Sequence, residues 1–280
     1  MNKISFLNGI FLPHSECFVH IDDRGFQMAD GVYEVIALKN NKLIDLDWHI
    51  ERLFRSLSEI EIKFSYSKKQ LQEIIGELFK QNNLNEGSVY LQITRGCAPR
   101  QQTFPENYVP TVIATVSSLP IIKAESLEEG FTAITHQDIR WQRCDIKSTS
   151  LLASSWIKNK AISLGADDAI LIRDEYVSEA TFSNVFIVDK NDNLITRNAD
   201  NFILCGITRN RIIDLAKKNN ILVIEKKFSV HEMLQASEVF LTSTTLSVRP
   251  FSKIDGHIIG EGKTGKITLK LLSLYKQFSS

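Results

Sequence analysis

The sequence predicts an α/β protein of two domains, each built on a mixed sheet. Short apolar segments typical of strands alternate with segments of helical periodicity, and 280 residues are enough for two hydrophobic cores. One polar, turn-rich stretch, SSLPIIKAESLEEG at 117–130, separates two such groups of segments. We therefore expect an N-terminal domain over 1–118, a linker over 119–123 and a C-terminal domain over 124–280.

The N-terminal domain is expected to contain five strand segments and two helices. The first helix begins near Asp47, and the second follows Ser67 as its N-cap. Apolar residues from Leu71 to Phe79 recur at helical spacing and predict one buried face of the second helix. The strand segments are 4–12, 17–23, 30–46 with a turn at Asn40-Asn41, 88–96 and 110–118.

The C-terminal domain is expected to mix strands and helices in the same way. The clearest helix starts near Leu151 and stops at Gly165, since glycine is typical just after a helix C-terminus. The other predicted helices cover 208–219 and 264–278. The predicted strands are 131–139, 168–173, 184–189, 222–228 and 238–244.

Composition limits the classes of partner and compartment. Lys+Arg and Asp+Glu both number 33, so a neutral chain gives no reason to expect nucleic acid or an anionic membrane as partner. No secretory signal and no apolar run of membrane-spanning length is apparent, and we expect a cytoplasmic protein. The four cysteines form no C-x-x-C pair and the six histidines are scattered, so free thiols and no metal site are expected.

Lys147 is the first candidate for chemistry. A lysine nucleophile needs an uncharged amine, which burial or a neighbouring cation favours. Lys147 follows a strand-like segment that contains Arg140 and Arg143, and the small residues 148–150 come after it. Taken alone, this pattern also fits a solvated charge at the end of a strand.

Glu179 gives Lys147 a chemical counterpart. Alone, Glu179 fits an ordinary loop carboxylate between strand-like segments. A pyridoxal phosphate enzyme, however, needs a lysine for the Schiff base and an acid near the ring nitrogen. That acid keeps the nitrogen protonated, so that the ring can accept electrons from the substrate Cα. Glu179 lies 32 residues after Lys147, which leaves room for a helix and a returning strand.

The same cofactor needs a cradle for its phosphate. Helix N-termini and clustered backbone amides bind anions, and Gly206-Ile207-Thr208 stands at the start of a predicted helix. The segment LTSTTLS at 241–247 offers further hydroxyls and amides, and Arg52 on the first helix offers a bidentate cation. Each feature is common by itself. Together with the lysine and the glutamate they form a set.

A competing motif is GEGKTGKI near the C-terminus. Gly260, Gly265 and Lys266 have the spacing of a nucleotide-binding P-loop. Ile267 stands where the serine or threonine that binds magnesium is required, and no second acidic strand follows. A turn before the last helix is therefore the better interpretation.

Seven segments, in the right order and spread over nearly the whole chain, resemble the fold-type IV, class IV aminotransferases. Within that family the resemblance is greatest to the D-amino acid aminotransferases. The segments are DRGFQMADGVYEV (23–35), WHIERL (48–53), LQITRGCAPRQQTFPEN (91–107), DIRWQRCDIKSTSLL (138–152), VSEATFSNVF (177–186), ILCGITR (203–209) and FLTSTT (240–245).

The resemblance implies pyridoxal 5′-phosphate (PLP) as cofactor and a role for each matching residue. Lys147 would be the Schiff-base lysine and proton shuttle, and Glu179 the partner of the pyridine nitrogen. Leu204 would support the ring face and Tyr33 would lie at the substrate carboxylate. The phosphate would be held by Arg52, the amides of Ile207 and Thr208, and Thr244.

The resemblance also implies a homodimer. In the family the active site lies between the two domains at the dimer interface, and the C-terminal domain binds PLP. An arginine and a histidine reach in from the neighbouring chain to bind the substrate carboxylate. Arg100 matches that arginine, whereas Gln102 stands where the family has its histidine.

The implied reaction is a ping-pong transamination that converts D-alanine and 2-oxoglutarate to pyruvate and D-glutamate. Aminodeoxychorismate lyases share the lysine and the glutamate, and so do the branched-chain and amine transaminases of class IV. These alternatives stay open, although the segment RGCAPRQQTFPEN follows the D-amino acid pattern. A PLP-binding protein without turnover would lack a working lysine, and Lys147 is present.

Overall fold

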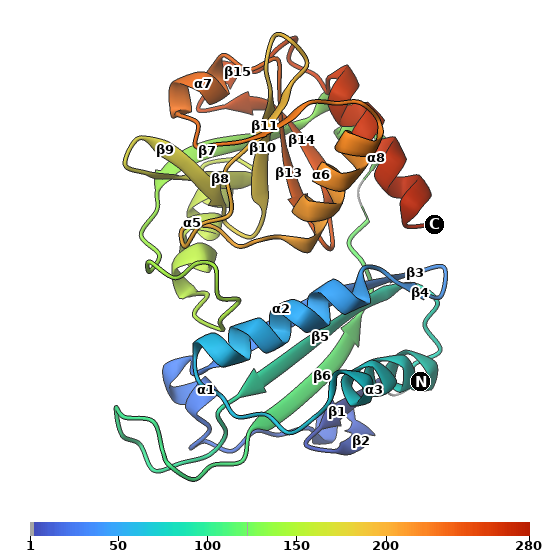
Figure 1. Ribbon diagram of the computed structural model, residues 1–280, viewed down its shortest axis with the longest axis vertical. Coiled ribbons are helices and arrows are strands. Elements are labelled where there is room, and N and C mark those ends of the chain that lie inside the picture. The colour runs from blue at the N-terminus through green and yellow to red at the C-terminus, as the bar shows by residue number, and fades with distance from the viewer. Residues whose placement is uncertain (1–2, 122) are drawn as a thin grey trace. The chain divides into compact units, whose positions relative to one another are not determined.

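The computed structural model describes residues 3–121 and 123–280, which fall into two compact units (Figure 1). Unit 1 comprises the described chain up to Leu119 together with Ile146–Ser150, and unit 2 comprises the rest. Both units combine helices with a sheet, so the predicted α/β class is confirmed. The segment Ile146–Ser150 belongs to unit 1, whereas the sequence-based division assigned these residues to the C-terminal domain.

Unit 1 is built on an antiparallel sheet, whose six strands within the described residues have the order β2-β1-β6-β5-β3-β4. The longest ladder joins β3 to β5, from Gly31 opposite Thr94 to Leu38 opposite Gly87. The strands are β1 (Ile4–Leu7), β2 (Ile10–Pro13), β3 (Gly31–Lys39), β4 (Lys42–Leu43), β5 (Gly87–Thr94) and β6 (Thr111–Ser117).

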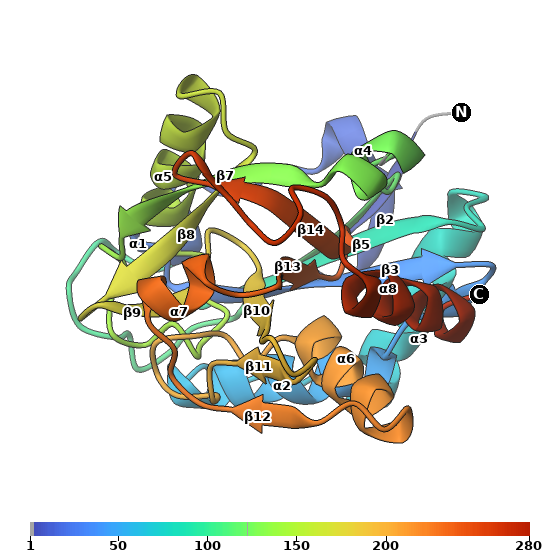
Figure 2. The ribbon, with the colours of Figure 1, turned by 90° about the horizontal axis from the view of Figure 1, so that it is seen from above.

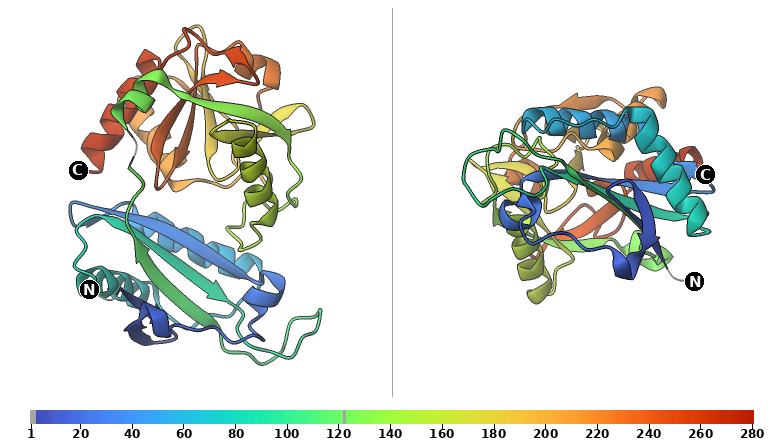
Figure 3. Two further views of the ribbon diagram at one scale, coloured as in Figure 1. Left: turned by 180° about the vertical axis from the view of Figure 1, so that it is seen from behind. Right: turned by 90° about the horizontal axis from the view of Figure 1, so that it is seen from below.

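Two helices, α2 (Leu46–Glu59) and α3 (Lys68–Gln81), cover one face of this sheet (Figures 1 and 3). Their apolar faces and the sheet form one buried core. Ser67 caps α3 as predicted: its hydroxyl accepts from the amide of Gln70 at 3.2 Å, and the Gln70 side chain accepts from the amide of Ser67 at 2.8 Å.

The predicted strand over 17–23 is wrong. Residues 17–20, which follow a 3₁₀ turn (η1, His14–Glu16), have no regular structure, and Asp23 caps the short helix α1 (Arg24–Met28). Its carboxylate accepts from the amide of Gly25 at 2.8 Å. A strand needs a neighbour for its backbone groups, which an apolar pattern alone cannot reveal. The large side chains of Phe18 and Ile21 are 78% and 72% exposed.

Unit 2 is built on a mixed sheet of order β12-β11-β10-β13-β14-β7-β8-β9, with β15 paired to β14. The pairs β7–β8, β7–β14 and β11–β12 are parallel, and the other pairs are antiparallel. The strands are β7 (Phe131–Gln137), β8 (Asp168–Arg173), β9 (Tyr176–Ala180), β10 (Asn184–Val188), β11 (Leu194–Thr196), β12 (Val223–Glu225), β13 (Glu238–Ser243), β14 (Ser247–Ile254) and β15 (His257–Ile258).

The helices of unit 2 confirm the three predicted ones to within about two residues. They are α5 (Leu152–Ser163), α6 (Ile207–Lys218) and α8 (Lys266–Phe278), together with the short, unpredicted α4 (Ala124–Glu129) and α7 (Val230–Leu234). Figure 2 shows α6 and α8 beside β13, where they share a buried core with Phe186 and Phe240. No helix in the described part of the chain has both the length and the apolar character to cross a membrane.

Candidate active site

Lys147 lies in a short segment that pairs with the start of β3. The amide of Tyr33 donates to the carbonyl of Lys147 at 3.0 Å, and the amide of Thr149 donates to the carbonyl of Gly31 at 3.0 Å. The neighbouring Ile146 is buried in the core of unit 1 and anchors the segment. Lys147 Nζ lies 4.3 Å from the centroid of the Tyr33 ring. Two residues predicted for the site, far apart in sequence, are therefore neighbours.

Arg52 lies on α2 and is paired with a buried carboxylate that the sequence did not single out. Its Nε and Nη2 donate to the two oxygens of Glu34 at 2.7 and 2.8 Å. His49 Nδ1 lies 2.7 Å from Glu34 Oε2, and the Glu34 side chain has no exposed surface. The segments 23–35 and 48–53 contain all three residues, but nothing in them indicated that the side chains meet.

The charges of this cluster are fixed by its pairing. Burial alone would raise the pKa of Glu34, but the positive charge of Arg52 and the hydrogen bonds of the cluster outweigh it and lower the pKa to about 2. Burial lowers the pKa of His49, while the charge of Glu34 opposes that shift. The cluster therefore holds an anionic glutamate against the arginine.

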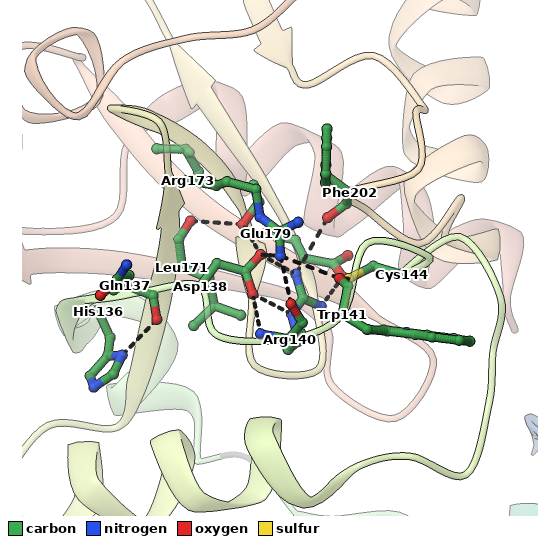
Figure 4. Close-up of polar contacts among 12 residues, drawn as sticks. His136, Gln137, Asp138, Arg140, Trp141, Cys144, Leu171, Arg173, Glu179 and Phe202 are labelled. Atoms are coloured by element: carbon green, nitrogen blue, oxygen red, sulfur yellow. Dashed lines mark hydrogen bonds and ion pairs between the residues drawn. The ribbon is translucent and has the colours of Figure 1, made fainter.

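Glu179 lies on β9 in unit 2, where three groups donate to its carboxylate. Arg140 donates through Nη1 to Oε1, while the amide of Leu204 and the side chain of Asn184 each donate to Oε2 at 3.1 Å. Figure 4 shows the Arg140 guanidinium between the carboxyl groups of Asp138 and Glu179. Two residues predicted for the site, Glu179 and Leu204, are thus brought together.

Arg140 is a residue of this cluster to which the sequence assigned no role in the site. It also donates through Nε and Nη2 to the two oxygens of Asp138, both at 2.9 Å. The sequence predicted a strand-like segment around Arg140, but β7 ends at Gln137 and the residues that follow it are irregular. Burial raises the pKa of Glu179 and the charge of Arg140 opposes this shift. A second cation beside Glu179 would therefore stabilise its ionised form.

The N-terminus of α6 lies next to Asn184. A Cβ on Gly206 would come within 2.0 Å of Asn184 Oδ1, so only glycine fits there without a shift. Gly206 is the N-cap and has no side chain to accept from the first amides of α6, which include those of Ile207 and Thr208. Asn184 Nδ2 also donates to the carbonyl of Leu204 at 2.8 Å. This asparagine therefore links the Glu179 carboxylate to the start of α6.

A buried hydroxyl on β13 lies on the same face of the sheet. Thr242 pairs with Asn184 across β10 and β13, so both side chains are on the side of the sheet that α6 covers. Thr242 Oγ1 is buried without a hydrogen-bond partner among the described residues. Thr244, the predicted phosphate contact, is half-buried in the turn that follows. An unsatisfied buried hydroxyl fits an acceptor supplied by a bound molecule.

Arg100 and Gln102 lie in the loop between β5 and β6 of unit 1. The structure leaves both side chains exposed.

The P-loop interpretation of GEGKTGKI is excluded by an observed contact at the start of α8. The carboxylate of Glu238 accepts from the amides of Ile267 and Thr268 at 2.9 and 2.7 Å, so the first turn of α8 already binds an anion of the protein itself.

Comparison with known proteins gives these groups a family. The family model of the class IV aminotransferases matches residues 31–254. The chain belongs to the class IV aminotransferases. Relatives of this class IV chain include the D-alanine aminotransferase of Listeria monocytogenes, 44% identical over 95% of this chain and 92% of the relative. Another is the D-alanine aminotransferase of Bacillus licheniformis, 45% identical over 93% of this chain and 92% of the relative.

A solved structure supports the same fold. The branched-chain amino acid aminotransferase of Escherichia coli superposes with a TM-score of 0.93 at 25% identity, over 100% of this chain and 95% of the other. Class IV aminotransferases depend on PLP, and this chain is therefore a PLP-dependent enzyme. Its groups fit that cofactor in kind: an amine, a buried carboxylate, an arginine, the backbone amides at the start of α6 and the unsatisfied Thr242 hydroxyl.

Proposed function

We propose that this aminotransferase converts D-alanine and 2-oxoglutarate to pyruvate and D-glutamate by ping-pong kinetics. The observation that carries the proposal is the identity of about 44% to D-alanine aminotransferases over more than nine tenths of the chain. The likeness to the branched-chain enzyme is much lower in sequence, at 25%. The presence of Lys147 against the ring of Tyr33 supports turnover rather than mere binding of the cofactor.

Two side chains carry the proton chemistry. PLP, when bound, supplies an electron sink that withdraws electrons from the substrate Cα. Lys147 would hold the cofactor covalently, and its amine, once free, would take the proton from the substrate Cα as a general base. Glu179 would keep the pyridine nitrogen protonated. Burial raises the pKa of the Glu179 carboxyl, so a cationic partner at this position would stabilise its ionised form.

The remaining roles are binding roles. Arg52, the amides of Ile207 and Thr208, and the Thr244 hydroxyl bind the phosphate, since each is a donor suited to an anion. Leu204 supports the ring face. Tyr33, Arg100 and Gln102 bind the substrate carboxylate, with a neutral amide at Gln102 where the family has a histidine.

The active unit is proposed to be a homodimer in which Arg100 serves the partner's site. The exposed apolar side chains of Phe18, Ile21 and Phe26 in unit 1 support a protein–protein interface. No nucleic-acid or membrane partner is proposed. The cytoplasmic location stays a prediction from the sequence, which cell fractionation would test.

The decisive experiment supplies the purified protein with a panel of D- and L-amino acids and 2-oxoglutarate, and separately with aminodeoxychorismate. We expect D-alanine to be the best donor and D-glutamate to be the product. Release of pyruvate and 4-aminobenzoate from aminodeoxychorismate, without transamination of any D-amino acid, would replace the proposal by the lyase. A preference for branched-chain L-amino acids would replace it by the branched-chain transaminase.

The covalent role of Lys147 is tested by borohydride. We expect reduction of the holoenzyme to fix the cofactor to the chain and to abolish its release on denaturation. Peptide mapping should find the label on Lys147. A label on another lysine would contradict the assignment, and Lys158, a half-buried lysine paired with Asp168, serves as a comparison within the same digest.

A further inference from the structure

Two buried arginines of unit 1 share one carboxylate. Arg24 and Arg95 are 2% and 1% exposed. Asp30 Oδ2 accepts from Nε of Arg24 at 2.7 Å and from Nε of Arg95 at 2.8 Å. Two cations face this single anion, so the remaining donors of both guanidinium groups need other acceptors.

Backbone carbonyls supply those acceptors. Arg95 donates through Nη1 and Nη2 to the carbonyls of Glu61 and Ile60, at 3.0 and 2.6 Å, at the end of α2. Arg24 donates through Nη1 to the carbonyl of Gln101 at 2.8 Å. Gln101 stands between Arg100 and Gln102, the two exposed side chains proposed to bind the substrate carboxylate.

Arg95 also packs against an aromatic side chain of the loop. The Arg95 guanidinium carbon lies 3.7 Å from the centroid of the Phe104 ring, a stacked cation–π contact. Tyr108 fixes the far end of the loop, since its hydroxyl accepts from the amide of Lys63 at 2.7 Å. The loop over 95–110 is thus tied to the body of unit 1 at several points, and Gln101 is the tie nearest Arg100.

The two ends of the loop over 95–110 also lie close together. Gly96 has φ +86°, and a Cβ on it would come within 1.9 Å of the carbonyl oxygen of Val109. The amide of Arg24 donates to the carbonyl of Gly96 at 2.9 Å. Arg24 therefore contacts the loop at two points: its backbone amide binds Gly96, and its side chain binds Gln101.

We propose that Arg24 is a positioning residue that holds the loop over 95–110 in the conformation that presents Arg100 and Gln102 to the substrate carboxylate. This inference rests on the proposed function. Arg24 donates to Asp30 and to Gln101 through two nitrogens of one rigid plane, whereas a lysine has a single nitrogen on a flexible stem and would not fix both directions. Arg24 touches neither substrate nor cofactor and acts only through the loop.

The test compares Arg24→Lys with wild-type holoenzyme. Hydrogen–deuterium exchange should show faster exchange of amides within 97–108. The KM for D-alanine should rise by about fivefold or more, with kcat within about twofold and an unchanged cofactor spectrum. Phe104→Leu is a second variant in case Arg24→Lys misfolds. It keeps both arginines and their hydrogen bonds but removes the ring from Arg95. It should also speed exchange in the loop and raise the KM.

Arg55→Lys is the matched control, since Arg55 is a largely exposed arginine of α2 in a long ion pair with Glu59. It should leave loop exchange and KM at wild-type values. In an Arg100→Lys background, which keeps a cation at this position of the loop, Arg24→Lys should lower kcat/KM by much less than it does in the wild type. Unchanged exchange in Arg24→Lys, faster exchange with an unchanged KM, or independent effects of Arg24 and Arg100 would each overturn the inference. A wild type inactive on D-amino acids would instead refute the proposed function, while the exchange data would still show whether Arg24 holds the loop.

Discussion

Glu179 is a buried carboxylate whose hydrogen-bond donors favour its ionised form, while its burial opposes ionisation. Arg140, Asn184 and the amide of Leu204 all donate to its carboxylate. Replacement by Gln keeps the size but removes the charge that holds a proton on the pyridine nitrogen. We expect Glu179→Gln to lower kcat for D-alanine at least about tenfold, or roughly 1.4 kcal/mol of barrier. Glu129→Gln, an exposed carboxylate of unit 2, should have no effect. Unchanged turnover in Glu179→Gln would remove the residue from the ring nitrogen.

Glu34 predicts a pH dependence of stability. Its pKa of about 2 in the folded protein lies below the ordinary value of 4.5, so the stabilisation is complete above about pH 4.5 and is lost as the pH falls through 2. The shift corresponds to roughly 3 kcal/mol. We expect Glu34→Gln to destabilise the cofactor-free protein by about 3 kcal/mol at pH 7, since it leaves Arg52 and His49 without their carboxylate. Chemical denaturation should show a smaller difference at pH 3, and an equal difference at both pH values would contradict this assignment.

Single residues were predictable from the sequence where chemistry restricts the residue type. A Schiff base needs a lysine and a pyridinium needs an acid, which singled out Lys147 and Glu179. The charges that surround them were not predictable, because Glu34 meets Arg52 and Arg140 meets Glu179 only through the folding of distant segments. No spacing rule connects such partners.

At the scale of elements, the start of α6 should depend on the absence of a side chain at Gly206. Gly206→Ala would drive a Cβ into the Asn184 side chain, which holds both the Glu179 carboxylate and the carbonyl of Leu204. We expect the dissociation constant for PLP to rise about tenfold or more, measured by fluorescence titration of the cofactor-free enzyme. The control is Gly76→Ala in the interior of α3, where a Cβ meets nothing within 4 Å. It should leave PLP affinity unchanged and stabilise the protein by about 0.5–1 kcal/mol. Equal affinities in the two variants would count against the role of Gly206.

Elements with strong local signals were predictable, and those defined by distant partners were not. The helix α3 combines a capping box with an apolar stripe, and both signals act within a few residues of each other. The segment 17–23 is also rich in apolar residues, but its only bridge within the described residues joins Asp23 to Cys97. The stretch after β7 has no regular structure, and the Asp138 carboxylate accepts there from Arg140, two residues later.

At the scale of the whole molecule, the proposed roles are divided between the two units. Lys147, Tyr33 and Arg52 belong to unit 1, whereas Glu179, Leu204 and the start of α6 belong to unit 2. The sequence separated two groups of elements but could not reveal that Ile146–Ser150 leaves its sequence neighbours for β3, because that assignment depends on hydrogen bonds to Gly31 and Tyr33. Neither unit carries all the proposed groups, so we expect activity only from the intact chain.

The proposed homodimer makes a prediction that no single chain can satisfy. If Arg100 serves the partner's site, a Lys147→Ala homodimer lacks the lysine in both sites and an Arg100→Ala homodimer lacks the arginine in both. A mixed dimer then contains one site with neither residue and one site with both. After subunit exchange between equal amounts of the two inactive variants, half of the dimers are mixed and half of their sites are intact. We therefore expect about a quarter of wild-type activity per chain. Exchange is verified by a mass tag on one variant, and each variant incubated alone is the control. Full exchange without recovery would mean that Arg100 acts within its own chain, or that it has no part in the reaction.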